Sequence, residues 1–508
     1  MKLLGILFLL GLSIEECIGY IKFASYYQNH MVLQRGPKHA VVWGTSDKLG
    51  DTVTVEVSGG HGNVTTKVVA DPNGQLDGVW TVKLPAITDH GPFTITASYR
   101  LGKVTIDDVL FGDVWVCSGQ SNMGFPISWL ANPSKVIAEA ANFPNIRLFK
   151  TRPVVSNSTF DNLHGLHQYW YKTSQASIST FSAVCWLYAQ YLFPHRKYPL
   201  GMVESAWGGT SIEAWSSPDA LSICPSKRKR GPSADSILWN SMMNPFTHMT
   251  IYGVLWYQGE HNAPHAERYA CEFPAMIADW RSKFHQGSLG ETDVNFPFGF
   301  VQLAPNTNAS FIGSFPALRW AQTAKFGRAP NTKMPNTFMA VAIDLPDFTA
   351  PHGSIHPRFK DDVAKRLVLA GRAVAYKEKD LDYQGPFPTA FGVNSPHKLL
   401  TVEFSGGHMP IEVRNNDGFE VCCSSSRTTT CGAHDVWVRA PITTHDTKSV
   451  TVSTSGCGSR HLVGLRYEWR TSPCPLRKCS VYGRDNDLPA PPYIRSHAFT
   501  DSSSHIIG

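Results

Sequence analysis

The chain contains 508 residues, a length that predicts two to four domains at roughly 100–200 residues each. Hydrophobic residues make up 42% and charged residues 17%, which provides a sizeable core and excludes an intrinsically disordered chain. The net charge of +6 comes from 46 basic and 40 acidic residues, so a nucleic-acid-binding protein driven by bulk positive charge is also excluded. The basic run 227–230 lies between prolines and is predicted to be a solvated loop, with a proteolytic processing site as the alternative.

Residues 1–19 have the layout of a secretory signal peptide. Lys2 precedes a short apolar run from Leu3 to Leu12, and small residues near Gly19 suit cleavage there. The run is too short for a comfortable membrane span, and no later stretch reaches about 18 consecutive apolar residues. We therefore expect a protein without a membrane span that enters the secretory pathway and is either secreted or lysosomal.

Sequons and cysteines agree with this compartment. Three N-x-S/T triplets predict glycosylation at Asn63, Asn157 and Asn308. Leaving out Cys17, the chain has ten cysteines, an even number of the kind that an oxidising compartment favours. Six of them occur late in the chain, and fifteen pairings of these six are possible. We expect a disulfide-stapled C-terminal region and leave the pairing open.

Residues 20–105 are predicted to form a small antiparallel β-sandwich. Apolar and polar residues alternate over short stretches, and turn-forming Gly, Pro and Asn residues separate these stretches. No helical period occurs in this part of the sequence. The clearest predicted strands are residues 52–57, 79–84 and 93–96.

Residues 106–382 alternate apolar strands with helical patterns. Runs typical of buried strands occur at residues 114–117, 146–149, 200–203, 254–257, 298–301 and 338–343. Helices are predicted at residues 134–141, 182–192, 273–284, 317–325 and 358–376. This alternation predicts βαβ units and a mostly parallel sheet, and ligands bind at the carboxyl ends of the strands of such sheets.

Residues 383–508 return to a β-strand pattern. Residues 399–404 and 450–453 are predicted strands, and the six late cysteines fall in the same region. The predicted fold class is therefore α/β, with a parallel-sheet core between an N-terminal and a C-terminal β-rich module.

A serine follows the first strand of the central region. Ser121 lies on a Gly-containing turn directly after residues 114–117, where its hydroxyl can stand beside backbone N–H groups. A serine in this position can equally cap a helix. The segment differs from the G-x-S-x-G elbow of α/β-hydrolases, because Met123 occupies the position of the second glycine.

Three further segments follow later strands. Gly208 and Gly209 let backbone N–H groups approach a ligand, although tandem glycines are more often a plain turn. Gln258 offers an amide that can donate to an oxyanion or satisfy local backbone groups. His356 precedes Pro357 after the last strand, and we expect it at the entrance of the following helix.

The ordered set of segments resembles the block pattern of the SGNH (GDSL-type) hydrolases, and more narrowly the sialate O-acetylesterase family. The resemblance spans nearly the whole chain after the predicted signal peptide. The strings that carry it are Asn29–Gln34, Asp113–Met123, Trp207–Trp215, Trp256–Asn262, Gly353–Pro357 and Leu488–Pro492.

This resemblance implies a role for each segment. Ser121 would be the nucleophile and His356 its general base. The oxyanion hole would be formed by the backbone N–H of Ser121, a backbone N–H of Gly208 or Gly209, and the side chain of Gln258. The implied reaction needs no cofactor.

The carboxylate of the triad is missing from its usual place. Many SGNH hydrolases carry an acid three residues before the histidine, where this chain has Gly353. We predict Asp344 as the acid, because it directly follows a strand and strand-end groups face the active-site crevice. The alternatives are Asp347, or a backbone carbonyl that leaves a Ser–His dyad. We expect no metal site, since His261 and His265 have a proline between them and no H-E-x-x-H motif is present.

The predicted function is that of a serine esterase, a carboxylic ester hydrolase acting on O-acetylated sialic acid, free or on glycoconjugates. Ser and His would remove the acetyl group by acyl transfer. One alternative is an acetylesterase for other carbohydrates such as acetylated xylan, because motifs do not report the pocket contacts that set specificity. Another is a catalytically inactive, secreted glycan-binding protein. The sequence leaves the oligomeric state open.

Overall fold

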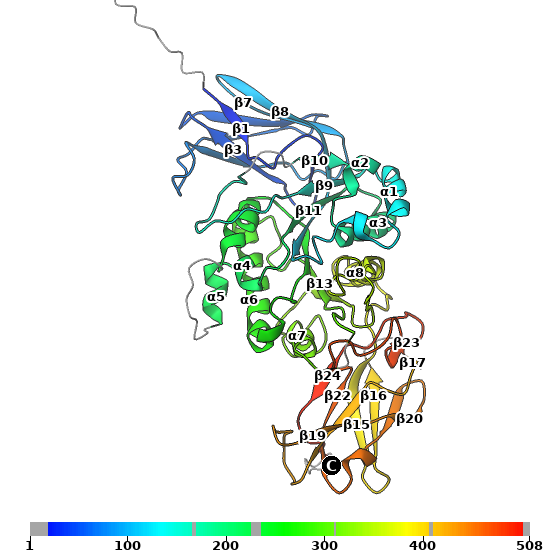
Figure 1. Cartoon of the computed structure of the whole chain (residues 1–508). Helices are drawn as coiled ribbons and strands as arrows, with labels where there is room; N and C mark the ends of the chain where they lie inside the picture. The colour runs from blue at the N-terminus through cyan, green and yellow to red at the C-terminus, as the bar shows by residue number, and fades with distance from the viewer. Residues whose placement is uncertain (1–18, 165–168, 225–234, 309–310, 406–409, 501–508) are drawn as a thin grey trace, which may run out of the picture.

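The computed structural model describes residues 19–164, 169–224, 235–308, 311–405 and 410–500. All of the predicted signal peptide except Gly19, and the whole basic run 227–230, lie outside the described residues. From top to bottom of Figure 1 the chain forms an N-terminal β-rich part, a central α/β part and a C-terminal β-rich part. The predicted fold class is confirmed.

The N-terminal part contains two groups of antiparallel strands. One is a three-stranded sheet of β1 (Ile21–Phe23), β3 (Val41–Ser46) and β6 (Val79–Lys83). The other joins β4 (Thr52–Val57), β5 (Asn63–Lys67) and β7 (Phe93–Tyr99) to the first half of β8 (Gly102–Gly119). Alternate residues of β4 are buried, as the period-two pattern predicts, and they pack into the core between the sheets.

Strand β8 connects the N-terminal and central parts. Its first half pairs antiparallel with β7, and its second half pairs parallel with β11 (Leu200–Ala206) and β12 (Gly253–Tyr257). The short strand β2 (Val32–Gln34) adds to β8 at residues 110–112. The predicted boundary at residue 105 therefore lies inside one continuous strand, and the two parts share an 11-stranded sheet.

The central sheet has the strand order β10-β9-β11-β8-β12-β13-β14. All pairs from β9 to β14 are parallel, whereas β10 is an antiparallel edge strand. Strand β8 comes first in the chain and lies between β11 and β12, so the winding direction reverses there, which is where a ligand crevice is expected. The remaining strands are β9 (Ile146–Lys150), β10 (Trp170–Lys172), β13 (Phe298–Gln302) and β14 (Thr337–Val341).

Helices cover both faces of the central sheet (Figure 1), with α1, α3 and α8 on one side and α4 to α7 on the other. The five predicted helices are present, and α6 is longer than its pattern predicts. Helices α2, α4 and α5 were not predicted, because they are too short to show a helical period. The helices are α1 (Pro133–Glu139), α2 (Gln175–Ile178), α3 (Ala183–Arg196), α4 (Ile212–Trp215), α5 (Pro218–Ile223), α6 (Ala266–Gly287), α7 (Phe315–Ala321) and α8 (Lys360–Val374).

Over its described residues, 383–405 and 410–500, the C-terminal part contains two four-stranded sheets and one strand pair. Their orders are β15-β16-β21-β20, β19-β18-β22-β24 and β17-β23. The two strands predicted here correspond to β16 and β21. The bounds are β15 (Phe387–Asn394), β16 (Leu399–Ser405), β17 (Ile411–Val413), β18 (Phe419–Ser424), β19 (Val436–Arg439), β20 (Ile442–His445), β21 (Ser449–Ser453), β22 (His461–Tyr467), β23 (Val481–Gly483) and β24 (Tyr493–Arg495).

Five disulfides pair the ten cysteines that remain when Cys17 is left out. Two lie in the central part and three staple the C-terminal part, as predicted. Such a set is typical of proteins that fold in the secretory pathway. The pairs are Cys117–Cys185, Cys224–Cys271, Cys422–Cys431, Cys423–Cys457 and Cys474–Cys479.

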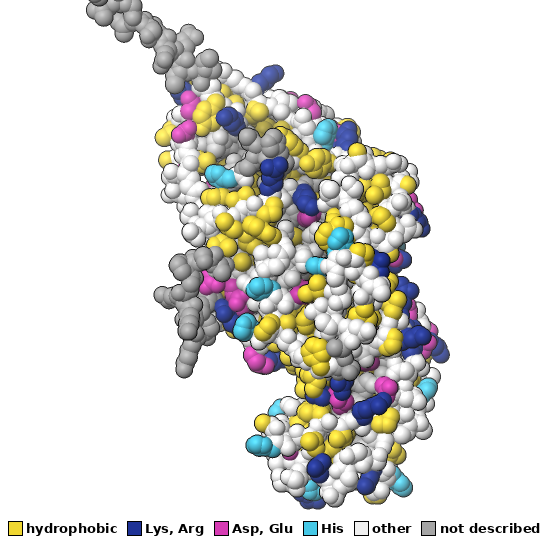
Figure 2. Space-filling view, in the orientation of Figure 1, with side chains coloured by type: hydrophobic (Ala, Val, Ile, Leu, Met, Phe, Trp, Pro, Cys, Tyr) yellow, Lys and Arg dark blue, Asp and Glu magenta, His cyan; other side chains and the backbone are white. Residues whose placement is uncertain are grey.

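The surface agrees with the charge balance of the sequence. On the face drawn in Figure 2, Lys and Arg side chains are interspersed with acidic ones over the described residues. The three sequon asparagines, Asn63, Asn157 and Asn308, are exposed and therefore accessible to glycosylation. Glycosylation at these positions stays a prediction. Within the described ranges, no helix combines the length and apolar character needed to span a bilayer.

Candidate active site

The turn after β8 presents Ser121. The backbone N–H groups of Met123 and Gly124 both donate to the carbonyl of Gln120, at 2.9 Å each, and this closes a tight turn around the serine. Gly119 has φ of +139°, and a Cβ there would lie 2.2 Å from the carbonyl oxygen of Tyr257, so only glycine fits. Ser121 lies in a turn and not at a helix start, which leaves its hydroxyl available for chemistry.

His356 lies in the loop between β14 and α8, and its ring reaches the serine. Its Nε2 is 2.9 Å from Ser121 Oγ, and its Nδ1 is 2.7 Å from the carbonyl oxygen of His352. A carbonyl only accepts hydrogen bonds, so in the neutral ring Nδ1 carries the proton and Nε2 offers a lone pair to the serine hydroxyl. This arrangement can take a proton from Ser121.

Trp129 braces the loop that carries His356. Its ring stacks on that of His352 with centroids 3.6 Å apart and planes 15° apart, and it lies 6.4 Å from the His356 ring. The contact holds the residue whose carbonyl orients His356. Sequence reasoning missed both Trp129 and His352, because the stacking partners lie far apart in the chain and no motif marks them.

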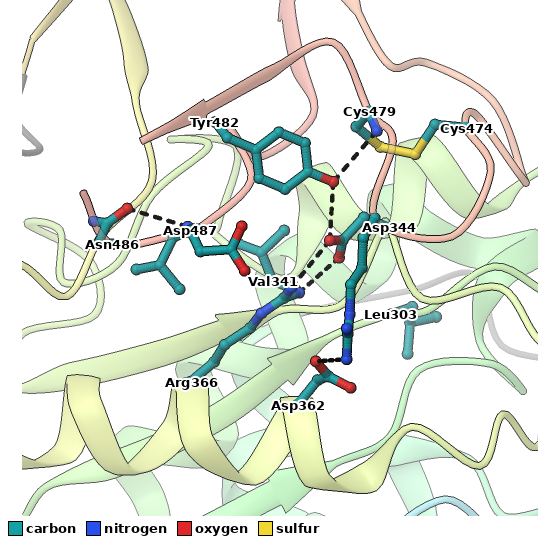
Figure 3. Close-up of polar contacts among 12 residues, drawn as sticks. Leu303, Val341, Asp344, Asp362, Arg366, Cys474, Cys479, Tyr482, Asn486 and Asp487 are labelled. Atoms are coloured by element: carbon teal, nitrogen blue, oxygen red, sulfur yellow. Dashed lines mark hydrogen bonds and ion pairs between the residues drawn. A yellow bond between two sulfur atoms is a disulfide. The ribbon is translucent and has the colours of Figure 1, made fainter. Parts of the chain in front are cut away.

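The structure does not bring Asp344, the predicted acid, to His356. Figure 3 shows its carboxylate between Arg366 of α8 and Tyr482 of the C-terminal part. Arg366 donates two hydrogen bonds of 2.6 and 3.0 Å, and the Tyr482 hydroxyl donates one of 3.0 Å. The physical reason is that Asp344 is fully buried beside the guanidinium of Arg366, where an ion pair with two hydrogen bonds compensates the loss of water for both charges.

Asp347, the alternative acid, also has another partner. Its carboxylate accepts from the backbone N–H, Nε and Nη2 of Arg358 at 3.0, 2.7 and 2.8 Å. These hydrogen bonds from Arg358 hold the pKa of the Asp347 carboxyl below its usual value. Of the three groups considered for orienting His356, the backbone carbonyl is the one in contact with Nδ1.

The loop after β11 lies against Ser121. Trp207 N–H donates to the carbonyl of Gly119 at 3.0 Å, which brings Gly208 beside Ser121. A Cβ on Gly208 would lie 3.2 Å from Ser121 Cβ, and Gly209 has φ of +74°. Among the described residues, the backbone N–H groups of Ser121, Gly208 and Gly209 have no acceptor, so they are available to an oxyanion.

Gln258 is buried beneath this loop. Its Nε2 donates to Asn262 Oδ1 at 2.8 Å and to the carbonyl of Thr210 at 3.2 Å, so both amide hydrogens already have acceptors. Asn262 in turn accepts from the N–H of Ile212 and donates to Glu213. In this structure Gln258 therefore stabilises the loop that contains Gly208 and Gly209.

Two family models match the chain. Residues 111–358 match the model described as carbohydrate esterase, sialic acid-specific acetylesterase. Residues 389–497 match the sialate O-acetylesterase C-terminal domain. The first match contains all of the residues described above except those of the C-terminal part and α8.

Similar proteins cover almost the whole chain. The sialate O-acetylesterase of Mus musculus is 40% identical, over 96% of this chain and 97% of its own length. That of Homo sapiens is 41% identical, over 94% and 92%. A carbohydrate acetylesterase from Xanthomonas citri has a similar structure, with a TM-score of 0.78, 29% identity and coverage of 94% of this chain and 100% of its own. With this identity over nearly its full length, the chain belongs to the sialate O-acetylesterase family.

Proposed function

We propose that this protein is a serine esterase that removes O-acetyl groups from acetylated sialic acids. The observation that carries the proposal is the 2.9 Å contact between Ser121 Oγ and His356 Nε2, with Nδ1 facing the His352 carbonyl. The names of the similar mouse and human proteins support sialic acid as the substrate class. The disulfides support delivery through the secretory pathway, to the outside of the cell or to the lysosome.

The first half of the reaction transfers the acetyl group to the enzyme. Ser121 Oγ attacks the acetyl carbonyl carbon while its proton moves to His356 Nε2. The tetrahedral intermediate collapses when the ester bond to the sugar breaks, and the departing sugar oxygen takes the proton from His356. The products of this half are acetyl-Ser121 and a free sugar hydroxyl.

The second half releases acetate. Water attacks the carbonyl of acetyl-Ser121 and gives a proton to His356 Nε2. The Ser121 oxygen then leaves and recovers that proton, which restores the enzyme. The His352 carbonyl keeps Nδ1 protonated throughout and stabilises the imidazolium that forms in each half, so this mechanism uses a dyad.

The developing oxyanion would be bound by backbone groups. The N–H groups of Ser121 and Gly208 are without acceptors among the described residues, and Gly208 lies against the nucleophile. Gln258 would act through the loop that it holds, by way of Thr210. Each such donor contributes roughly 10²–10³ in kcat in serine hydrolases.

Deacetylation of other carbohydrates is the second candidate. The solved relative from Xanthomonas citri is named more broadly as a carbohydrate acetylesterase, and it covers nearly all of this chain. Specificity depends on pocket contacts that a shared fold does not set. A catalytically inactive glycan-binding protein is less well supported, because the nucleophile and base are in hydrogen-bond contact.

The test measures acetate release by the purified protein from O-acetylated sialic acids and from acetylated xylan. Ser121→Ala is compared with Ser128→Ala, which removes an exposed hydroxyl elsewhere in the same segment. We expect release from the sialic acids, a loss of roughly 10³-fold or more in Ser121→Ala, and wild-type rates in Ser128→Ala.

Each contrary result is informative. Release from xylan alone would replace the substrate class and keep the mechanism. A folded Ser121→Ala variant with near-normal activity would refute the nucleophile. No release from any acetylated carbohydrate would favour the glycan-binding alternative.

A further inference from the structure

A lysine is buried behind the proposed nucleophile. Lys360, the first residue of α8, is 0% exposed. Its Nζ donates to Asn122 Oδ1 at 2.7 Å and to the carbonyl of Pro357 at 2.6 Å. It also lies over the rings of Phe125 and Tyr257, at 4.4 and 5.4 Å from their centroids. The ammonium group therefore has two oxygens and two aromatic faces as partners.

Asn122 joins this lysine to both sides of the site. It directly follows Ser121, and its Nδ2 donates to Glu260 Oε1 at 2.6 Å and to the carbonyl of Ile355 at 2.8 Å. The amide can adopt one orientation only, because Oδ1 must face the Lys360 ammonium while Nδ2 must face two acceptors. The residue after the nucleophile is thus fixed against the loop of the base.

The loop of the base is held on both sides of His356. The carbonyl of Ile355, the residue before it, accepts from Asn122, and the carbonyl of Pro357, the residue after it, accepts from Lys360. These contacts join three segments that are far apart in sequence: the turn after β8, the loop after β12, and the loop that leads into α8 with the first residue of that helix. We call the hydrogen-bonded set of Lys360, Asn122, Glu260, Ile355 and Pro357 the frame. Ser121 and His356, which are 2.9 Å apart, are chain neighbours of its members.

We propose that Lys360 is a positioning residue for catalysis, which sets the distance between Ser121 and His356 through Asn122 and Pro357. The inference rests on the proposed function, since it concerns the same serine and histidine. A displacement of about 1 Å in such a pair costs roughly 10²-fold in rate. A residue that sets this distance therefore controls kcat, while substrate affinity depends on other contacts.

Two carboxylates, those of Glu260 and Asp347, attract the Lys360 ammonium. Burial lowers the pKa of the Lys360 ammonium to about 7, against the attraction of Glu260 and Asp347, and burial raises the pKa of the Glu260 carboxyl. Asp347 is itself paired with Arg358. On α8, Asp361 and Asp362 pair with Lys365 and Arg477. Glu260 and Lys360 are thus the two ionisable groups of the frame.

The test replaces Lys360 with methionine, which fills a similar volume without donors. The matched control is Lys365→Met, an exposed lysine of the same helix. We expect kcat of Lys360→Met to fall roughly 10- to 100-fold with KM within about twofold, and Lys365→Met to behave as wild type. The rate at which an organophosphorus reagent labels Ser121 should fall in parallel, because it depends on the same pair.

Asn122→Ala and the double variant Asn122→Ala/Lys360→Met complete the test. If both residues act through one frame, the fold-loss of kcat in the double variant is close to the larger of the two single fold-losses. If they act independently, it is the product of the two single fold-losses. If Lys360→Met does not fold, the double variant Lys360→Met/Glu260→Gln is measured in its place, because it removes both buried charges and leaves neither one uncompensated.

Two results would overturn the inference: a folded Lys360→Met variant with wild-type kcat and labelling rate, or losses that multiply in the double variant. Failure of the proposed function gives a different pattern, in which the wild-type protein releases no acetate or Ser121→Ala stays active.

Discussion

The N-terminal and C-terminal β-rich parts are joined to the central part in different ways. The N-terminal part shares strand β8 with the central sheet, and its buried residues belong to the same hydrophobic core. The C-terminal part has a separate core of its own, built around residues such as Leu400, Val421 and Leu465. One joint is a continuous strand and core, and the other is a contact between two packed surfaces.

The C-terminal contact uses buried polar groups. Tyr482 reaches Asp344, and the N–H of Arg477 donates to the Asp344 carbonyl at 2.8 Å. Arg319 of α7, fully buried, donates to the carbonyls of Arg470 and Thr471 at 2.8 Å each. A small apolar cluster of Val341, Ile343, Tyr482 and the Cys474–Cys479 disulfide completes the contact.

Two residues of one segment, between β14 and α8, contact different parts of the molecule. The chain from β14 to α8 carries Asp344, which faces the C-terminal part, and then His356, which faces Ser121. The carboxylate of Asp344, at a strand end and close in sequence to the loop of His356, therefore contributes to the joint between the central and C-terminal parts. We expect the N-terminal and central parts to unfold together, and the C-terminal joint to be weakened by single polar substitutions.

The largest effect is expected at the shared strand. Phe111 of β8 is fully buried and packs against Phe93, so Phe111→Ala should cost about 3–5 kcal/mol of unfolding free energy. Circular dichroism and tryptophan fluorescence should report one coincident transition at a lower Tm, with Phe326→Ala, at a more exposed ring, as the control. Two separate transitions in the N-terminal and central parts would contradict a shared core.

Asp344→Asn should destabilise the C-terminal joint and leave the chemistry intact. The change leaves Arg366 as a buried cation without its carboxylate, at a cost of about 3 kcal/mol. Denaturant unfolding and limited proteolysis of the C-terminal part would measure it, with the exposed Asp485→Asn as control. We expect kcat of the folded variant near wild type. A large loss of kcat with unchanged stability would instead make Asp344 the acid that serves His356.

Tyr482→Phe tests the same joint from the other side. It removes the hydroxyl that donates to the buried Asp344 carboxylate and accepts from the Cys479 N–H, and it keeps the ring, so we expect a loss of about 1.5–3 kcal/mol. Tyr171→Phe, at an exposed tyrosine of β10, is the matched control. Denaturation midpoints should differ between the two variants. Equal midpoints would show that the Tyr482 hydroxyl does not stabilise the joint.

The smallest effect concerns Asp347, whose hydrogen bonds stay within the loop of His356. Its folded-state pKa lies below the unfolded value, so its stabilising effect is present above the unfolded pKa and is lost as pH falls through the folded pKa. Asp347→Asn should therefore cost roughly 1 kcal/mol at pH 7, and the difference from wild type should shrink below about pH 4. Melting curves from pH 7 to pH 3 would measure this. A difference that is constant with pH would exclude the ion pair as its source.

The sequence by itself predicted the α/β fold class and the main strands and helices of the central part, but not that β8 continues from the N-terminal part into the central sheet. Period-two alternation predicted β4 and β6, and apolar runs followed by helical patterns predicted the parallel sheet, because these periods follow directly from strand and helix geometry. The position of Ser121, Gly208 and Gln258 after three adjacent strands followed from the rule for strand ends. The family of the chain was also evident from its ordered motifs.

What faces His356 was decided only by the tertiary structure. Both Asp344 and Asp347 suit the position of a triad acid in the sequence, yet each is paired with an arginine, and the His352 carbonyl takes the contact. A backbone carbonyl has no residue type, so no motif can mark it. The partner of a buried charge is likewise set by which side chains the fold brings together, and Arg366, Tyr482 and Lys360 lie far from their partners in sequence. Local patterns depend on neighbours along the chain, whereas these contacts depend on the packing of distant elements in a medium of low dielectric, where a buried charge needs an opposite charge or hydrogen-bond partners.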